Sequence, residues 1–153
     1  MTVYLASYKA PGTIIDRFIR LWTGSIYSHS ELMIDGMCYT SSGRDKGVRR
    51  KAMSLPPEKW DLQPLPWADR HKIEAYFQLT RKHRYGYLRL LLTQMFNLGS
   101  NEAFLARVGR LLRLRPAVFC SDWIAAALGL PAAGIYNPGG LDALCRWITA
   151  NRT

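Results

Sequence analysis

The stretch from Ser28 to Ser42, SHSELMIDGMCYTSS, decides the fold. Two runs of alternating polarity flank Asp35-Gly36, a pair that favours a two-residue type I′ turn because both central residues need positive φ. The stretch therefore predicts a β-hairpin. Pairing outward from the turn gives six rows: Ile34 with Met37, Met33 with Cys38, Leu32 with Tyr39, Glu31 with Thr40, Ser30 with Ser41, and His29 with Ser42.

This register predicts two unlike faces, because side chains alternate along a strand. The apolar face holds Leu32, Ile34, Met37 and Tyr39. The mixed face holds His29, Glu31, Met33, Cys38, Thr40 and Ser42. Polar groups are thus expected to gather around His29, at the end of the hairpin far from the turn.

Periodicity predicts the elements around the hairpin. Strands are expected over 2–8, 48–53 and 60–65. Helices are expected from Thr13 to a stop at Gly24, over 68–82, 86–96 and 101–113, from Cys120 onward, and over 141–150, with 137–140 as a loop. Early strands followed mainly by helices predict an α+β fold. A chain of 153 residues with 48% hydrophobic residues fits a single domain over 1–153.

Cys120 follows the apolar residues 117–119 and begins an amphipathic helix. The positive end of the helix dipole favours a thiolate, which is the nucleophilic form of cysteine. His29 is the candidate base, and the backbone N–H of Cys120 is a candidate donor to an oxyanion. The alternatives remain open at this point, because most free cysteines are buried packing residues and His29 could be a structural histidine.

A group that orients the His29 imidazole is also needed. The hairpin register points to Thr40 and Ser42 on the neighbouring strand, with Glu31 beside His29 on its own strand. The sequence leaves the choice among these three open.

Cysteine spacing and motif content exclude several classes of site. Cys38, Cys120 and Cys145 lie far apart without a C-x-x-C pair, so no zinc site or disulfide framework is expected, and no metal or cofactor is predicted. Cys38 and Cys145 are interpreted as packing residues. No G-x-S-x-G, H-E-x-x-H, P-loop or G-x-G-x-x-G motif is present. The sequence therefore lacks the motifs that would indicate a serine hydrolase, a zincin or a nucleotide-binding protein.

The net charge of +10 and the pI near 9.9 predict attraction to polyanions such as nucleic acid, anionic lipid or wall polymer. Solvated helix and strand faces are the alternative interpretation. The basic residues form three clusters: Arg44, Lys46, Arg49, Arg50 and Lys51; Arg81, Lys82, Arg84 and Arg89; and Arg107, Arg110, Arg113 and Arg115.

The sequence shows no basic and apolar signal segment at its start, so a cytoplasmic protein in a reducing compartment is expected. The longest apolar stretch, 123–135, falls far short of the roughly 20 residues that a spanning helix needs. Small size and the absence of a signal favour a bacterial or phage-encoded protein. The oligomeric state is left open.

Several short motifs, in order along the chain, resemble those of one protein family. The run 19–29, IRLWTGSIYSH, precedes the hairpin; 84–87, RYGY, resembles a helix-entry motif; 119–122, FCSD, resembles a nucleophile motif; and Asn137-Pro138 with Leu141 resembles a closing segment. Together they resemble the YiiX-like branch of the NlpC superfamily. These are circularly permuted papain-like cysteine hydrolases, in which the histidine strand precedes the cysteine helix.

The resemblance implies a small antiparallel sheet with a packed nucleophile helix, Cys120 as nucleophile and His29 as base. The third polar residue of the family falls on Thr40, where the family carries an acid. Glu31, predicted opposite Thr40, could restore that charge.

The implied function is a cysteine peptidase or amidase-type hydrolase that cleaves an amide or ester through a thioester. Peptidoglycan peptides, other amides and lipid acyl groups stay open as substrates. Two alternatives are kept. One is an impaired binding module whose basic clusters contact polyanions, motivated by the missing acid at Thr40. The other is an acyltransferase, because lecithin retinol acyltransferase-like proteins share the permuted arrangement.

Overall fold

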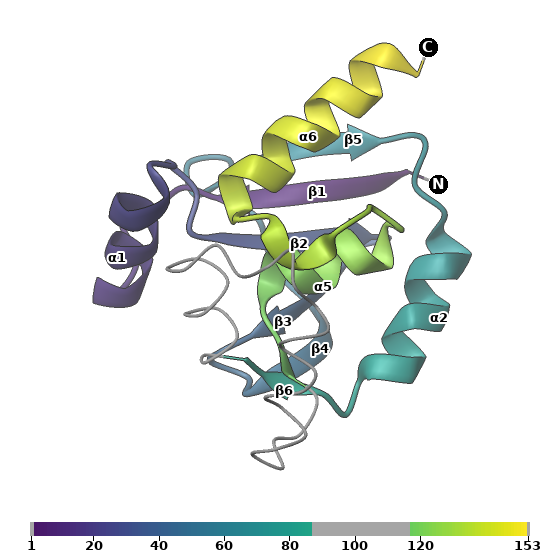
Figure 1. The fold of residues 1–153 in the computed structure, drawn as a ribbon, viewed down its shortest axis with the longest axis horizontal. Coiled ribbons are helices and arrows are strands. Elements are labelled where there is room, and N and C mark those ends of the chain that lie inside the picture. The colour runs from purple at the N-terminus through teal and green to yellow at the C-terminus, as the bar shows by residue number, and fades with distance from the viewer. Residues whose placement is uncertain (1, 87–116, 153) are drawn as a thin grey trace.

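A seven-stranded sheet lies at the centre of the computed structural model, which describes residues 2–86 and 117–152 (Figure 1). Its strand order is β5-β1-β2-β3-β4-β6-β7, antiparallel except between β6 and β7. The strands are β1 (Val3–Tyr8), β2 (His29–Ile34), β3 (Met37–Ser42), β4 (Gly47–Ala52), β5 (Trp60–Leu65), β6 (Arg84–Tyr85) and β7 (Ala117–Val118). The helices are α1 (Ile14–Thr23), α2 (Arg70–Thr80), α5 (Cys120–Ala127) and α6 (Pro138–Asn151), with a short 3₁₀ turn, η2 (Ala133–Ile135).

The predicted α+β class is confirmed, and most predicted elements appear close to their expected bounds. The helical segments predicted over 86–96 and 101–113 lie, apart from Gly86, outside the described residues. The loop predicted over 137–140 is wrong. Asn137 caps α6 by accepting the Gly140 N–H at 2.7 Å, and Pro138 occupies the first helical position, where its missing N–H costs nothing.

The hairpin turn is confirmed, since φ is 50° at Asp35 and 76° at Gly36. The three rows nearest the turn pair as predicted, ending with Leu32 opposite Tyr39. The other three predicted rows are not part of the ladder. Instead the Thr40 hydroxyl donates to the Ser30 carbonyl at 2.8 Å, so a side chain takes the acceptor that the backbone ladder would have used.

The core lies between one face of the sheet and the helices α2, α5 and α6 (Figure 1). The apolar hairpin face contributes to it as predicted, with Leu32, Ile34 and Tyr39 buried. Burying a Leu, Ile or Phe side chain stabilises the fold by about 1.5–3 kcal/mol. The helices supply Ile73 and Phe77 from α2, Trp123 and Ile124 from α5, and Leu141 and Cys145 from α6.

Polar contacts then fix the start of α5. The Ser41 hydroxyl donates to the Val118 carbonyl at 2.7 Å, just before the helix begins. The Ser121 hydroxyl donates to the carbonyl of Tyr136 at 2.6 Å. Since β3 carries Ser41, the first contact holds the segment before α5 beside the hairpin, and the second joins the first turn of α5 to the residue after η2.

Helix α1 lies at one end of the molecule, far from α2 at the other (Figure 1). It starts at a Thr13 capping box and ends at Gly24, as predicted, and it has no buried residue. Of the helices in the described ranges, none has the length and apolar content to cross a membrane.

Candidate active site

His29 begins β2 and faces two aromatic neighbours. Tyr8 of β1 is its cross-strand partner, and Trp60 of β5 is the partner of Tyr8 in turn. The ring centroids lie 4.9 Å apart for Tyr8 and Trp60, and 6.3 Å apart for His29 and Trp60. The aromatic row leaves the His29 side chain only 22% exposed.

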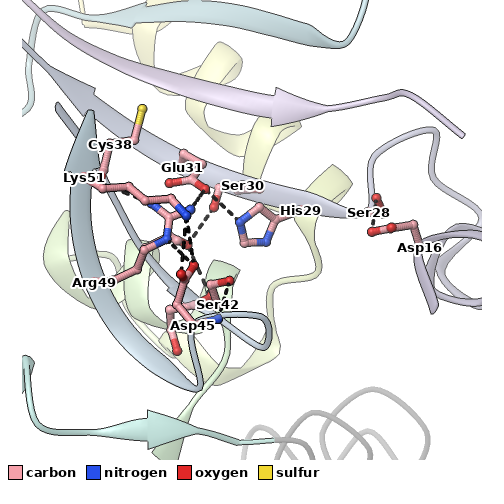
Figure 2. Close-up of polar contacts among 12 residues, drawn as sticks. Asp16, Ser28, His29, Ser30, Glu31, Cys38, Ser42, Asp45, Arg49 and Lys51 are labelled. Atoms are coloured by element: carbon pink, nitrogen blue, oxygen red, sulfur yellow. Dashed lines mark hydrogen bonds and ion pairs between the residues drawn. The ribbon is translucent and has the colours of Figure 1, made fainter. Parts of the chain in front are cut away.

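Glu31 holds one side of the imidazole. The two side chains share a face of β2, and His29 Nε2 lies 3.1 Å from Glu31 Oε1 (Figure 2). Glu31 is fully buried, and a buried carboxylate needs a charged or hydrogen-bonding partner. The Arg49 guanidinium supplies it, donating to the same Oε1 at 2.5 Å while its Nε donates to Asp45 at 2.7 Å.

Cys120 is a second neighbour that acts on the imidazole. It is the first residue of α5, is 4% exposed, and is among the neighbours that raise the pKa of His29. Helix α5 packs against both β2 and β3, and β2 begins with His29.

The electrostatics of His29 follow from these neighbours. Burial by itself would lower the pKa of His29, but the charge and hydrogen bond of Cys120, followed by those of Glu31, raise it from 6.5 to about 10. The two neighbours therefore favour the charged imidazolium form of His29.

Of the residues predicted for the site, the fold brings Cys120, His29 and Glu31 together. Thr40 differs from its expected role, because its buried hydroxyl donates to backbone carbonyls, at 2.8 Å to Ser30. Ser42 accepts a hydrogen bond from the backbone N–H of Asp45 at 3.4 Å. Among the described contacts of His29, the carboxylate of Glu31 therefore occupies the orienting position.

The other two cysteines are buried, as their interpretation as packing residues requires. Burial, together with the charge of Glu31, raises the pKa of Cys38 to about 11. Burial, together with the charge of Asp142, raises the pKa of Cys145 to about 12. Both thiols therefore stay neutral near physiological pH.

A cleft of about 380 Å³ opens beside His29 and Glu31. Its lining combines the aromatic residues Tyr8, Trp60 and Tyr85, the apolar residues Ile15, Ile19 and Met53, and the charged residues Asp16, Arg44, Asp45, Arg49 and Lys51. Cys120 is not part of this lining, so His29 is the link between the cleft and the sulfur. Among the described residues, no group of three His, Cys, Asp or Glu side chains is placed to hold a metal ion.

Sequence reasoning missed two contributors to the site, Arg49 and Trp60. Arg49 was assigned only to a basic cluster, although it lies opposite Thr40 in the β3–β4 register and so shares the face that carries Glu31. Trp60 was assigned only to a strand. A pairing of β5 with β1 was the signal needed to place its ring near His29.

No protein-family model, no curated protein and no solved structure matches this chain.

Proposed function

We propose that this protein is a cysteine hydrolase that cleaves an amide or ester, with Cys120 as nucleophile, His29 as base and Glu31 as the residue that orients His29. The observation that carries the proposal is the contact of His29 Nε2 with Glu31 Oε1 at 3.1 Å, together with the pKa of His29, which Cys120 and Glu31 raise against the effect of burial. The proposal includes a circularly permuted papain-like fold, supported by the order of the elements, in which the histidine strand precedes the cysteine helix.

In the proposed reaction, the imidazole takes the Cys120 proton, and the imidazolium is stabilised by the Glu31 carboxylate. The thiolate attacks the carbonyl carbon, and the oxyanion accepts a hydrogen bond from the Cys120 N–H, which has no acceptor inside the helix ladder. His29 then protonates the leaving amine or alcohol as its bond to carbon breaks. Water, deprotonated by His29, hydrolyses the thioester and releases the acid.

The cleft supports a substrate with a modest acyl portion, because its volume lies at the lower end of ordinary ligand pockets. Peptidoglycan peptides and lipid-linked acyl groups both contain such portions. Acyl transfer would use the same thioester, with an alcohol or amine in place of water. The binding-module alternative loses its motive, since Glu31 supplies the acid that Thr40 lacks.

Alkylation of the three cysteines tests the activated nucleophile. Iodoacetamide at about pH 6, with the modified sites mapped by mass spectrometry, should modify Cys120 at least about tenfold faster than Cys38 or Cys145, because only thiolates react. His29→Ala should abolish this advantage. Cys38 and Cys145 are internal controls, since both are buried and their pKa values are raised.

Cys120 reacting no faster than a free cysteine peptide at that pH would contradict the activated thiolate. Cys120 is nearly buried, so a small reagent is required for this comparison. If an acyl substrate is found, product analysis with an added amine acceptor separates hydrolysis from transfer. Turnover by Cys120→Ala would overturn the assignment of the nucleophile.

A further inference from the structure

Helix α1 carries its apolar side chains on the outside of the molecule. Ile14 and Leu21 are each 85% exposed, and Ile15, Phe18 and Trp22 are about half exposed. A surface helix ordinarily turns such a stripe toward the core. Here none of its residues is buried, so the usual orientation is reversed.

The polar side of α1 holds the helix in this orientation. The Arg20 guanidinium donates to the carbonyls of Lys9, at 2.8 Å, Ala10, at 2.5 Å, and Pro11. Asp16 accepts a hydrogen bond from the Ser28 hydroxyl at 3.1 Å (Figure 2). These contacts join α1 to the loop before it and to the residue that precedes β2. The outward apolar face is therefore a consequence of specific hydrogen bonds.

We propose that α1 is an interfacial helix that docks this protein on an anionic lipid bilayer. Helices that lie in a membrane surface bury an apolar face of Leu, Ile, Phe and Trp at the boundary between headgroups and acyl chains. Phe18 and Trp22 stack with ring centroids 5.9 Å apart, which forms a broad aromatic surface on that face. Ile26, 64% exposed and just beyond the helix, extends the apolar surface.

Charge complementarity favours an anionic bilayer as the partner of the exposed apolar face of α1. The chain carries a net charge of +10, and Arg17 on α1 is exposed. Arg44 is also exposed and lines the same cleft as Ile15 of α1. Anionic headgroups attract basic residues near the surface, whereas two copies of a chain with this charge repel each other. A second copy is therefore the weaker candidate for this face.

Docking through α1 would bring the membrane surface to the cleft. Ile15 and Ile19 belong to α1 and also line the cleft that contains His29. The bilayer would thus lie beside the imidazole. The docking itself needs no chemistry at Cys120, so it can be tested separately from the proposed hydrolase activity.

Co-sedimentation of the full chain with vesicles tests the proposal. We expect binding to vesicles of phosphatidylcholine with phosphatidylglycerol, and much weaker binding to phosphatidylcholine alone or at high salt. Phe18→Glu with Leu21→Glu should weaken binding at least about tenfold, because charged groups replace apolar ones in the docking face. Arg17→Gln should weaken it about fivefold, the effect of one basic residue near an anionic surface.

A matched control and a catalytic variant make the test specific. Leu79→Glu places the same charge on a leucine that is 80% exposed on α2, at the far end of the molecule, and should bind as the wild type does. Cys120→Ala should also bind unchanged. Loss of vesicle binding in Cys120→Ala would contradict a docking face that is separate from the site.

Three further results would overturn the proposal. The first is an absence of wild-type binding to the anionic vesicles. The second is full binding by the Phe18→Glu, Leu21→Glu double variant. The third is a marked loss of thermal stability, or dissociation of a dimer, in that double variant, because the face would then be covered by protein.

Discussion

At the residue scale, Glu31 connects the candidate active site on β2 to Arg49, a basic residue of β4. Its Oε1 contacts His29 Nε2 and accepts a hydrogen bond from the Arg49 guanidinium. A carboxylate taken out of water is costly unless such partners compensate it. Arg49 therefore balances the carboxylate, and the carboxylate in turn stabilises a charged imidazole.

Glu31→Gln should separate the charge of this residue from its shape. The amide keeps a hydrogen-bond acceptor near His29 but removes the charge, so the pKa of His29 should fall from about 10 toward 6.5. A hydrogen bond to a charged group contributes about 1.5–3 kcal/mol, and we therefore expect alkylation of Cys120 at about pH 6 to slow about tenfold or more. The rate is measured as a function of pH.

Thr40→Val is the matched control at the position where the family resemblance expects an acid. Its hydroxyl donates to Ser30, so its loss should cost about 1 kcal/mol of unfolding free energy. The pH profile of Cys120 alkylation should not move. A profile altered by Thr40→Val and unaffected by Glu31→Gln would return the orienting role to Thr40.

The sequence could place these residues on one face but could not choose between them. Alternation along β2 and β3 correctly gives His29, Glu31 and Thr40 a common side. The choice depends on where the β2–β3 ladder ends, and nothing in the alternating pattern encodes the Thr40 hydrogen bond that replaces a ladder contact. The role of Arg49 depends on a third strand, beyond the reach of hairpin reasoning.

At the scale of elements, the hairpin turn is the most strongly encoded feature, and Gly36→Ala tests it. Gly36 has φ of 76°, and an added Cβ would meet no atom within 4 Å. The cost of alanine is therefore purely conformational, about 1–2 kcal/mol. The melting temperature measured by thermal unfolding should decrease by about 2–4 °C for each kcal/mol of lost stability.

Gly36→Asn is the control, because asparagine tolerates the left-handed region better than alanine does. It should lose less stability than Gly36→Ala. Equal stability of the alanine variant and the wild type would show that the turn does not require positive φ, and the type I′ assignment would be wrong.

Two other elements show where sequence reasoning fails at this scale. Gly139 and Gly140 favoured a loop before α6, yet the structure needs a glycine there, since a Cβ on Gly139 would lie 2.2 Å from Ser25 Oγ. Close packing explains that residue better than chain flexibility does. For α1, periodicity predicted an amphipathic helix, but the side that faces outward depends on the hydrogen bonds of Arg20 to a neighbouring loop.

At the scale of the whole molecule, the predicted basic clusters are unlike one another. In the first, Arg49 and Lys51 pair with Asp45, and Arg50 pairs with Glu74, so much of its charge is balanced locally. The third cluster lies outside the described residues, as does Arg89 of the second. The rest of the second, Arg81, Lys82 and Arg84, is exposed. Polyanion binding by the clusters remains a prediction.

The titration of His29 should make the stability of the whole fold depend on pH. Cys120 and Glu31 raise its folded pKa to about 10 against the burial that lowers it, whereas the unfolded value is near 6.5. A group whose pKa is raised on folding stabilises the folded state fully below the unfolded pKa. This contribution is then lost as pH rises from about 6.5 to about 10. Tyr27 titrates later, since burial and its hydrogen bond to Asp61 raise its pKa to about 12.

Thermal unfolding measured across this window should therefore show a falling melting temperature between about pH 6.5 and 10. We expect a drop of at least about 2–4 °C, which corresponds to 1 kcal/mol in a chain of this size. In Cys120→Ala the fall should still begin near the unfolded pKa of about 6.5 but end closer to neutral pH, because the variant removes the largest influence that raises the folded pKa of His29. His29→Gln should largely remove the fall in melting temperature between about pH 6.5 and 10. Tyr27→Phe should change the melting temperature only above about pH 10. If the melting temperature falls over the same pH range in the wild type, in Cys120→Ala and in His29→Gln, then the protonation of His29 is not coupled to Cys120 in the folded protein.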